Sequence, residues 1–217
     1  EIVITAVSAR SAQKDRGIDL APYAWEADPV ALAKRPDVDI FVELMGGHEG
    51  PAKEATEAAL NAGKDVVTAN KALLAHHGQK LAENAENGGK VLRFEAAVAG
   101  GIPVVKALTE GLAGNDITRI LGVMNGSCNY ILTRMQTAGL SYADVFAEAE
   151  ALGYLEADPE LDVGGIDAGH KLALLSSIAY GTEVNFEGVE LEGIGQIYRG
   201  AISNRRKQSQ FMPCIDP

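Results

Sequence analysis

The sequence predicts an α/β fold in which a doubly wound parallel sheet is followed by an α+β domain. In the first half, short apolar runs alternate with helical patterns, and each run is apolar along its length. Such strands are typical of a parallel sheet covered on both faces. After about residue 98 this alternation stops. We therefore expect a partial doubly wound domain over 1–98, a second domain over 99–197 and an atypical tail over 198–217.

The elements of the first half follow from their residue patterns. The predicted strands are Ile2–Ser8, a β-branched run, and the apolar segments 38–44, 65–68 and 90–94, and a short helix is predicted over 28–34. The next helix starts at Pro51, since proline suits the first helical position. The helix over 71–86 ends at Asn87-Gly88-Gly89. A doubly wound sheet binds ligands at the carboxyl ends of its strands.

The second half has a different pattern, which predicts a substrate domain built around an open sheet. The expected elements are a helix over 102–112, a long strand over 117–125, and helices over 127–136, 142–152 and 166–180. An acidic segment precedes the last helix. We find no internal repeat and no low-complexity segment.

The composition narrows the classes of partner. The chain has 217 residues and a net charge of -11, which argues against a nucleic-acid backbone or an anionic membrane. No apolar run approaches the roughly 20 residues that cross a bilayer. We find no signal-like start and expect a cytoplasmic protein. Two cysteines are too few for a disulfide framework, and the four histidines lack the spacing of a zinc site.

The segment 153–171 concentrates charged residues before an otherwise apolar helix. Asp167 and Lys171 are four residues apart, so they share a helix face. Glu156 and Asp162 precede them on an approach that contains proline and glycine and can fold back over that face. A carboxylate can hold a substrate ammonium, and a lysine can exchange a proton. The alternative interpretation is a capped helix with a solvated charge cluster.

The beginning of the chain lacks one expected feature. A Gly-x-Gly-x-x-Gly turn is the usual first element of a dinucleotide-binding sheet, whereas Glu1 stands inside a predicted strand. We expect either that the chain is truncated at its N-terminus or that no dinucleotide binds.

Four segments make the chain similar to a known family. They are Thr68-Ala-Asn-Lys-Ala-Leu-Leu-Ala75, Glu95-Ala-Ala-Val-Ala-Gly-Gly-Ile-Pro103, Gly122-Val-Met-Asn-Gly-Ser-Cys-Asn-Tyr-Ile-Leu-Thr133 and the segment 153–171. In this order they resemble homoserine dehydrogenase. With the sheet pattern, the resemblance covers roughly residues 1–195, and the tail after residue 197 departs from it.

The resemblance implies an NAD(P)-dependent oxidoreductase. The implied reaction interconverts L-homoserine and L-aspartate 4-semialdehyde in the biosynthesis of threonine, methionine and isoleucine. Lys171 matches the acid/base lysine, Glu156 the substrate-binding glutamate and Asp167 the aspartate that faces the substrate. Tyr154 and Asp162 lie in further matching positions. For Asp162 and Asp158 the alternative is a structural role as caps of the following turn.

Two basic residues point to the cofactor. Lys71 follows a strand end, and in the family the matching lysine lies near the nicotinamide and the substrate, so the resemblance implies a catalytic as well as a cofactor-binding role for Lys71. If Lys71 and Lys171 converge, each disfavours the charge of the other and lowers its pKa, while the nearby acids oppose this. Arg10 lies just past the first strand, where an arginine suits a 2′-phosphate, so we favour NADP over NAD. The alternatives are an exposed helix-start lysine and a solvated loop arginine.

The resemblance also implies a monovalent cation and a dimer. Glu95, Val98, Gly100 and Ile102 match the family's cation site, in which one carboxylate and backbone carbonyls hold sodium or potassium. From spacing alone this segment is a strand-to-helix hinge. The family usually forms homodimers through the sheet of the second domain.

Two other functions remain open at this point. Cys128 at a helix N-terminus could hold a thiolate of low pKa, as in acylating semialdehyde dehydrogenases that pass through a thioester. Without the glycine-rich turn, the chain could also be an inactive fragment that only binds substrate.

Overall fold

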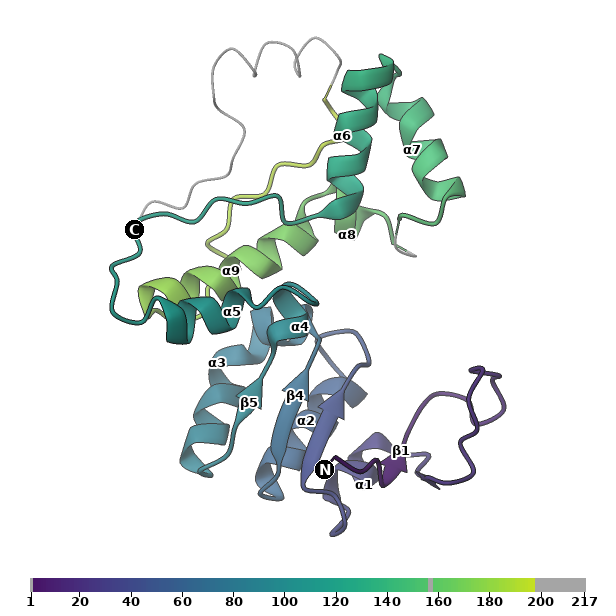
Figure 1. The fold of residues 1–217 in the computed structure, drawn as a ribbon, viewed down its shortest axis with the longest axis vertical. Coiled ribbons are helices and arrows are strands. Elements are labelled where there is room, and N and C mark those ends of the chain that lie inside the picture. The colour runs from purple at the N-terminus through teal and green to yellow at the C-terminus, as the bar shows by residue number, and fades with distance from the viewer. Residues whose placement is uncertain (1, 156–157, 198–217) are drawn as a thin grey trace. The chain divides into compact units, whose positions relative to one another are not determined.

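The computed structural model describes residues 2–155 and 158–197. The chain divides into two compact units, one that ends at Gly111 and one that begins at Leu112 (Figure 1). The boundary near residue 98 stays a prediction, and the predicted tail over 198–217 lies outside the described residues.

The N-terminal unit contains two small parallel sheets. In one, β1 (Ala6–Val7) pairs with β2 (Ala24–Trp25); in the other, β3 (Ile40–Glu43), β4 (Asp65–Thr68) and β5 (Leu92–Arg93) follow one another in space. Every pair is parallel. The predicted α/β class is confirmed as an incomplete Rossmann-like fold. The first strand is shorter than predicted, and the short strand β2 was not predicted.

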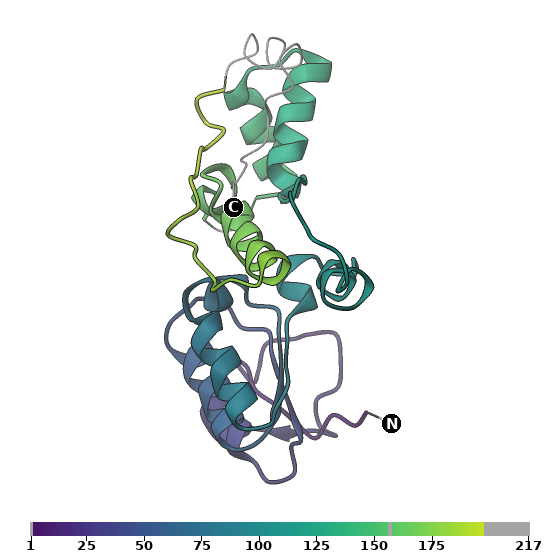
Figure 2. The same cartoon turned by 90° about the vertical axis from the view of Figure 1, so that its left-hand side faces the viewer.

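Helices α2 (Pro51–Asn61) and α3 (Lys71–Asn87) start where the sequence places them, and α1 (Pro29–Lys34) starts one residue later than predicted, because Asp28 is its cap. The Asn70 side chain caps α3 by accepting the Leu73 N–H, so one unpaired donor of the first turn is satisfied. Helices α2 and α3 lie together on one side of the β3–β5 sheet (Figure 2). The apolar core between these helices and the sheet includes Phe41, Val66 and Leu81.

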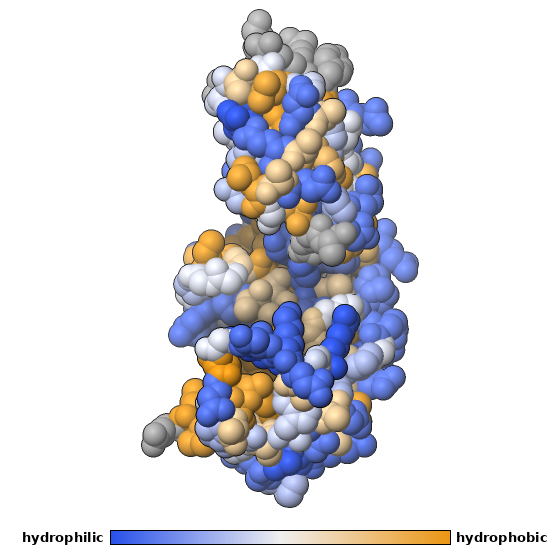
Figure 3. Space-filling view, turned by 90° about the vertical axis from the view of Figure 1, so that its right-hand side faces the viewer, coloured by the Kyte–Doolittle hydropathy of each residue, from blue (hydrophilic) through white to orange (hydrophobic). Residues whose placement is uncertain are grey.

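The opposite face of this sheet is exposed. Because strand side chains alternate, Ile40, Val42 and Val67 point away from α2 and α3. The exposed fraction of Val42 is 54% and that of Leu44, just after β3, is 74%. Apolar atoms also gather at the lower left of the surface view (Figure 3). We predicted that both faces of the sheet are covered. Within the described residues, helices cover one face and the other face is exposed.

The helix predicted over 102–112 forms as two pieces that follow α4 (Glu95–Val98). Helix α5 (Val104–Lys106) runs into a turn of π-helix, η1 (Ala107–Gly111). The Glu95 carboxylate accepts the N–H groups of Val105 and Lys106, at 2.8 and 3.1 Å. An acidic side chain at a helix start satisfies donors that have no partner within the helix.

The second unit is helical in its described part. It contains α6 (Gly126–Ala138), α7 (Tyr142–Ala151), α8 (Glu160–Val163) and α9 (Ile166–Tyr180). Helices α6 and α7 share a core around Ile131, Met135 and Val145. The predicted limits of α9 are confirmed residue for residue. Helix α8, inside the acidic segment, was not predicted.

The predicted long strand over 117–125 is wrong. These residues form no strand, and the described residues of their unit contain none to pair with them. An apolar run becomes a strand when a neighbour accepts and donates its backbone hydrogen bonds. Along the described chain, no helix is both long and apolar enough to span a bilayer.

Removing core volume behind the β3–β5 sheet should destabilise the N-terminal unit. Leu81 is 1% exposed, and its replacement by alanine leaves a cavity. We expect Leu81→Ala to lower the free energy of unfolding by about 2–5 kcal/mol, measured by urea denaturation. The neighbouring Lys80→Ala removes a surface ion pair and should change it by less than about 1 kcal/mol. Equal effects of the two substitutions would contradict this packing.

Candidate functional site

Lys171 and Asp167 form the centre of the candidate site, on the first two turns of α9. The Lys171 ammonium donates to Asp167 Oδ2 and to the Met124 carbonyl, both at 2.8 Å. The Asp167 side chain is 5% exposed and that of Lys171 20% exposed. The predicted shared face of these two residues is therefore confirmed.

Asn125 connects this pair to a second carboxylate. Its Nδ2 donates to Asp162 Oδ1 at 2.8 Å and to Asp167 Oδ2 at 3.1 Å. Its Oδ1 accepts the Cys128 N–H at 2.7 Å and so caps α6. Asn125, Asp162 and Asp167 are all buried. One amide side chain thus fixes the start of α6 against two acids.

The hydrogen bonds explain how two carboxylates are buried together. A buried charge is costly unless it is paired and hydrogen-bonded, and here Asn125 and Lys171 supply the donors. An ammonium has three N–H donors, and Lys171 uses two for Met124 and Asp167. Among the described residues no group takes the third, and because the lysine is partly exposed this N–H can reach a bound molecule. The arrangement suits proton exchange with a hydroxyl or carbonyl oxygen.

The other predicted substrate residues differ in their surroundings. Tyr154 is exposed; its ring meets that of Tyr130 edge-on, with centroids 4.9 Å apart. The Ser127 hydroxyl donates to the Tyr154 carbonyl at 2.6 Å, which ties α6 to the start of the acidic segment. Glu156 lies outside the described residues.

The capping alternative applies to one of the two aspartates. The Asp158 carboxylate accepts the Glu160 N–H at 3.2 Å, in the turn that leads into α8. Asp162 instead turns its side chain to Asn125. Asp162 therefore belongs to the buried cluster, and Asp158 has a local structural role.

Cys128 is a packed thiol. Its Sγ–H donates to the Asp162 carbonyl at 3.2 Å. Burial, and then the charges of Asp162 and Asp167, raise the pKa of Cys128 to about 11. A thiol of this pKa is protonated at neutral pH, so the geometry opposes its use as a thiolate nucleophile.

Two predicted cofactor residues lie in the N-terminal unit. Lys71 is the first residue of α3, three residues after Thr68, which ends β4. Arg10 is exposed in the segment after β1. Nearby, Arg16 donates to the carbonyls of Ser11 and Lys14 and shapes this loop. Both positions are the strand-end positions that the sequence indicates, and the convergence of Lys71 with Lys171 stays a prediction.

The predicted cation residues Glu95, Val98, Gly100 and Ile102 lie on α4 and the turn after it. Val98 is buried, and the Ile102 carbonyl accepts the Val104 N–H at 2.8 Å. The Glu95 carboxylate caps α5, but carboxylate and carbonyl oxygens each have two lone pairs. The donor set is all oxygen and fits a hard monovalent cation. Within residues 2–155 and 158–197, no group of three His, Cys, Asp or Glu residues is arranged to hold a metal.

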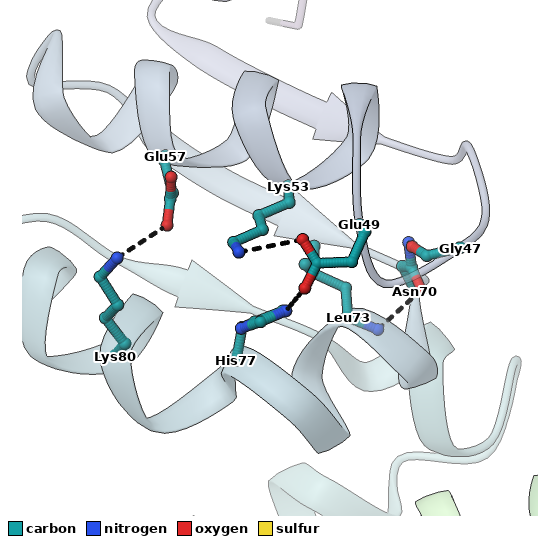
Figure 4. A network of polar contacts seen from close by, with 8 residues as sticks. All are labelled: Gly47, Glu49, Lys53, Glu57, Asn70, Leu73, His77 and Lys80. Carbon is teal, nitrogen blue, oxygen red and sulfur yellow. Dashed lines mark hydrogen bonds and ion pairs between the residues drawn. The ribbon is translucent and has the colours of Figure 1, made fainter.

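A polar network at the carboxyl end of the β3–β5 sheet was not predicted (Figure 4). Glu49, in the loop after β3, accepts from Lys53 at 3.0 Å and pairs with His77 of α3 at 2.7 Å. These two hydrogen bonds, Lys53 first, hold the pKa of Glu49 below its ordinary value. Asn70 Nδ2 donates to the Gly47 carbonyl at 2.7 Å. The sequence signal is a set of polar residues just after two strands.

Comparison with known proteins defines first the class of protein. Residues 1–95 match the family profile described as the NAD-binding domain of homoserine dehydrogenase. With the parallel sheet, this identifies an NAD-binding α/β unit joined to a second unit that carries the lysine–carboxylate site. Residues 103–215 match the profile described as homoserine dehydrogenase. The chain belongs to the homoserine dehydrogenase family.

Individual relatives agree. The chain is 50% identical over 197 residues to homoserine dehydrogenase of Neisseria gonorrhoeae (91% of this chain, 45% of that protein). It is 52% identical over 178 residues to the Corynebacterium glutamicum enzyme (82% and 40%). The crystal structure of the Thiobacillus denitrificans homoserine dehydrogenase superposes with a TM-score of 0.87 at 43% identity, covering 93% of this chain and 46% of that one. The chain thus spans less than half the length of these relatives.

Asn125 should be essential to the buried cluster. Asn125→Ala removes a donor shared by two buried carboxylates, which should lower the free energy of unfolding by about 1–3 kcal/mol. Asn125→Asp keeps a capping oxygen but places a third carboxylate beside the two, so it should destabilise at least as much. Asn129→Ala, exposed on the same helix, is the control and should change the value by less than about 0.5 kcal/mol. Wild-type stability of Asn125→Asp would contradict this cluster.

Cys128 should react slowly with thiol reagents. In a Cys214→Ser variant it is the one remaining cysteine. Since its pKa is about 11, the thiolate fraction and the rate of iodoacetamide alkylation should still rise as pH increases from about 7 to about 10. Mass spectrometry of the modified peptide measures the rate. If the alkylation rate stops rising at or below pH 9.0, the ordinary pKa of a thiol, the thiolate is stabilised instead.

Proposed function

We propose that the protein is a homoserine dehydrogenase that interconverts L-homoserine and L-aspartate 4-semialdehyde with a nicotinamide dinucleotide. This reaction belongs to the biosynthesis of threonine, methionine and isoleucine. The observation that carries the proposal is the Lys171 ammonium, held by Asp167 and the Met124 carbonyl in the unit whose sequence matches the family.

Lys171 is the proposed proton exchanger. When bound, the nicotinamide supplies or accepts the hydride. In the reductive direction Lys171 donates a proton to the aldehyde oxygen, and in the oxidative direction it takes the proton of the homoserine hydroxyl. Asp167 keeps the ammonium in place through its 2.8 Å hydrogen bond.

The amino-acid end of the substrate needs an anion to hold its ammonium. We assign this role to Glu156, with Asp162 and Tyr154 as further contacts. Asp162 supports the assignment because it lies in the same buried cluster as Asp167, both bound by Asn125. A substrate of this size would then have its reacting oxygen at Lys171 and its charged end at the acids.

NADP is the proposed cofactor, with NAD as the alternative. Arg10, exposed after β1, carries the charge that suits a 2′-phosphate. A hyperthermophilic archaeal homoserine dehydrogenase, 33% identical to this chain with a TM-score of 0.72 over 80% of this chain and 53% of that one, was solved in complex with NADPH. Lys71, the first residue of α3, follows β4 at the edge where doubly wound sheets bind ligands, and this supports a role for it beside the nicotinamide.

Three further properties are part of the proposal. Glu95 with the carbonyls of Val98, Gly100 and Ile102 would hold sodium or potassium, as the all-oxygen set favours. The protein would be a cytoplasmic homodimer; its two cysteines accord with a reducing compartment. We expect no nucleic acid or membrane partner, because the net charge of -11 would repel both.

The thioester mechanism is the less favourable alternative. It requires a thiolate at Cys128, whereas burial and two carboxylates raise the pKa of that thiol to about 11. The fragment alternative, binding without turnover, differs from the main proposal in a single measurable property, the oxidation of homoserine.

Homoserine-dependent reduction of NADP and NAD tests the proposal. We expect Lys171→Ala to lower turnover at least about 100-fold, since general acid–base catalysis contributes that much. The exposed Lys80→Ala is the matched control and should retain wild-type rates. Arg10→Ala should raise the KM for NADP more than that for NAD. Wild-type turnover in Lys171→Ala, or no turnover in the unmodified protein, would overturn the catalytic assignment.

A further inference from the structure

Glu43 is a buried carboxylate that the proposed chemistry does not use. It is the last residue of β3 and is 0% exposed. Its Oε1 accepts the Met45 N–H at 2.6 Å, and its Oε2 accepts the Thr68 hydroxyl at 2.5 Å. Thr68 is the last residue of the neighbouring strand β4. The carboxylate therefore joins the ends of two strands and the loop that follows the first.

The hydrogen bonds continue from Thr68 to the start of α3. The Thr68 Oγ1 accepts the Asn70 N–H at 2.9 Å. Asn70 uses its Oδ1 to cap α3 and its Nδ2 to donate to the Gly47 carbonyl at 2.7 Å (Figure 4). The relay Glu43–Thr68–Asn70 thus begins and ends at the loop 44–50.

This loop is exposed and nevertheless held at several points. Residues 44–49 are all exposed. Besides the contacts at Met45 and Gly47, Glu49 is held by Lys53 and His77 (Figure 4). A Cβ added at Gly46 would meet open space, so the backbone there can be approached closely. Such a loop is ordered by hydrogen bonds more than by burial.

The location of the loop indicates what the relay does. It connects the carboxyl end of β3 to α2, and ligands of doubly wound sheets bind at this edge. An apolar residue at a buried strand position would avoid the desolvation cost of a carboxylate. A carboxylate with two fixed acceptors instead specifies the position of a loop amide and of a neighbouring strand. This requirement is expected at a binding edge and not in a purely structural core.

We propose that Glu43, through Thr68 and Asn70, is a positioning residue that holds the loop 44–50 in the conformation that accepts the dinucleotide. The inference rests on the proposed dehydrogenase function. None of the three side chains needs to touch the cofactor. Their role is to fix the backbone of the loop 44–50, which contacts the cofactor. The loop is then already ordered before the dinucleotide binds.

Two matched substitutions at Thr68 test the relay. Thr68→Val keeps the shape and removes the hydroxyl, whereas Thr68→Ser keeps the hydroxyl. Hydrogen exchange of the peptide that covers 44–50 reports on the loop. The Kd for NADPH, by fluorescence, and the KM for homoserine report on the two ligands separately.

We expect Thr68→Val to speed exchange in the loop and to raise the Kd for NADPH roughly tenfold, the effect of leaving a buried acceptor without its donor. The homoserine KM should not change, and Thr68→Ser should bind NADPH as the unmodified protein does. A general loss of stability would instead raise exchange throughout the unit and change both ligands. Unchanged loop exchange, or faster exchange with an unchanged Kd, overturns the inference.

A second variant covers the case in which Thr68→Val does not fold. Asn70→Asp keeps the capping oxygen but removes the donor to the Gly47 carbonyl. It should give the same pattern of faster loop exchange and weaker NADPH binding, and an unchanged Kd overturns the inference. If the unmodified protein binds neither NADPH nor NADH, the proposed function itself fails, which is a different result from equal binding by all variants.

Discussion

The candidate site depends on how two buried carboxylates obtain their hydrogen-bond donors. Asp162 and Asp167 approach the same amide, and neither can remain buried and charged without partners. Asn125 and Lys171 supply them. This need fixes the start of α6, the approach of α8 and the first turns of α9 against one another. It also fixes the direction of the Lys171 ammonium, which is the group that the proposed chemistry uses.

Both units contain an asparagine that caps a helix and also fixes a second segment. Asn70 caps α3 and Asn125 caps α6, each through its Oδ1. Since the cap fixes the plane of the amide, the direction of Nδ2 is fixed as well. Asn70 directs it to the Gly47 carbonyl and Asn125 to the two acids. The start of a helix thereby fixes the position of a second segment. Ordering an asparagine side chain for this purpose costs less conformational entropy than ordering a longer side chain.

Some features of the fold and of the candidate site could be predicted from the sequence because they depend on local geometry. The spacing of Asp167 and Lys171 requires a shared helix face, and α9 has the predicted limits. Strand β4 and the start of α2 were also predicted correctly, because a short apolar run and a proline at the first helical position are local signals. These features need no knowledge of distant residues.

The rest depends on contacts between distant segments. The sequence places Asn125 at the end of the predicted strand over 117–125, and its contact with Asp162, 37 residues away, follows only from the fold. Glu43 looks like the polar end of a strand until Thr68, 25 residues on, is placed beside it. The strand over 117–125 failed for the same reason, since an apolar run predicts a strand but cannot supply the neighbour that it needs.

A crystal structure of the protein with NADP and a non-reacting homoserine analogue would test the central claim most directly. The account predicts that Lys171 Nζ lies within about 2.6–3.2 Å of the ligand's reacting oxygen while it keeps its contacts to Asp167 and the Met124 carbonyl. A ligand whose reacting oxygen lies away from Lys171, or an ammonium that leaves Asp167 when the ligand binds, would contradict it.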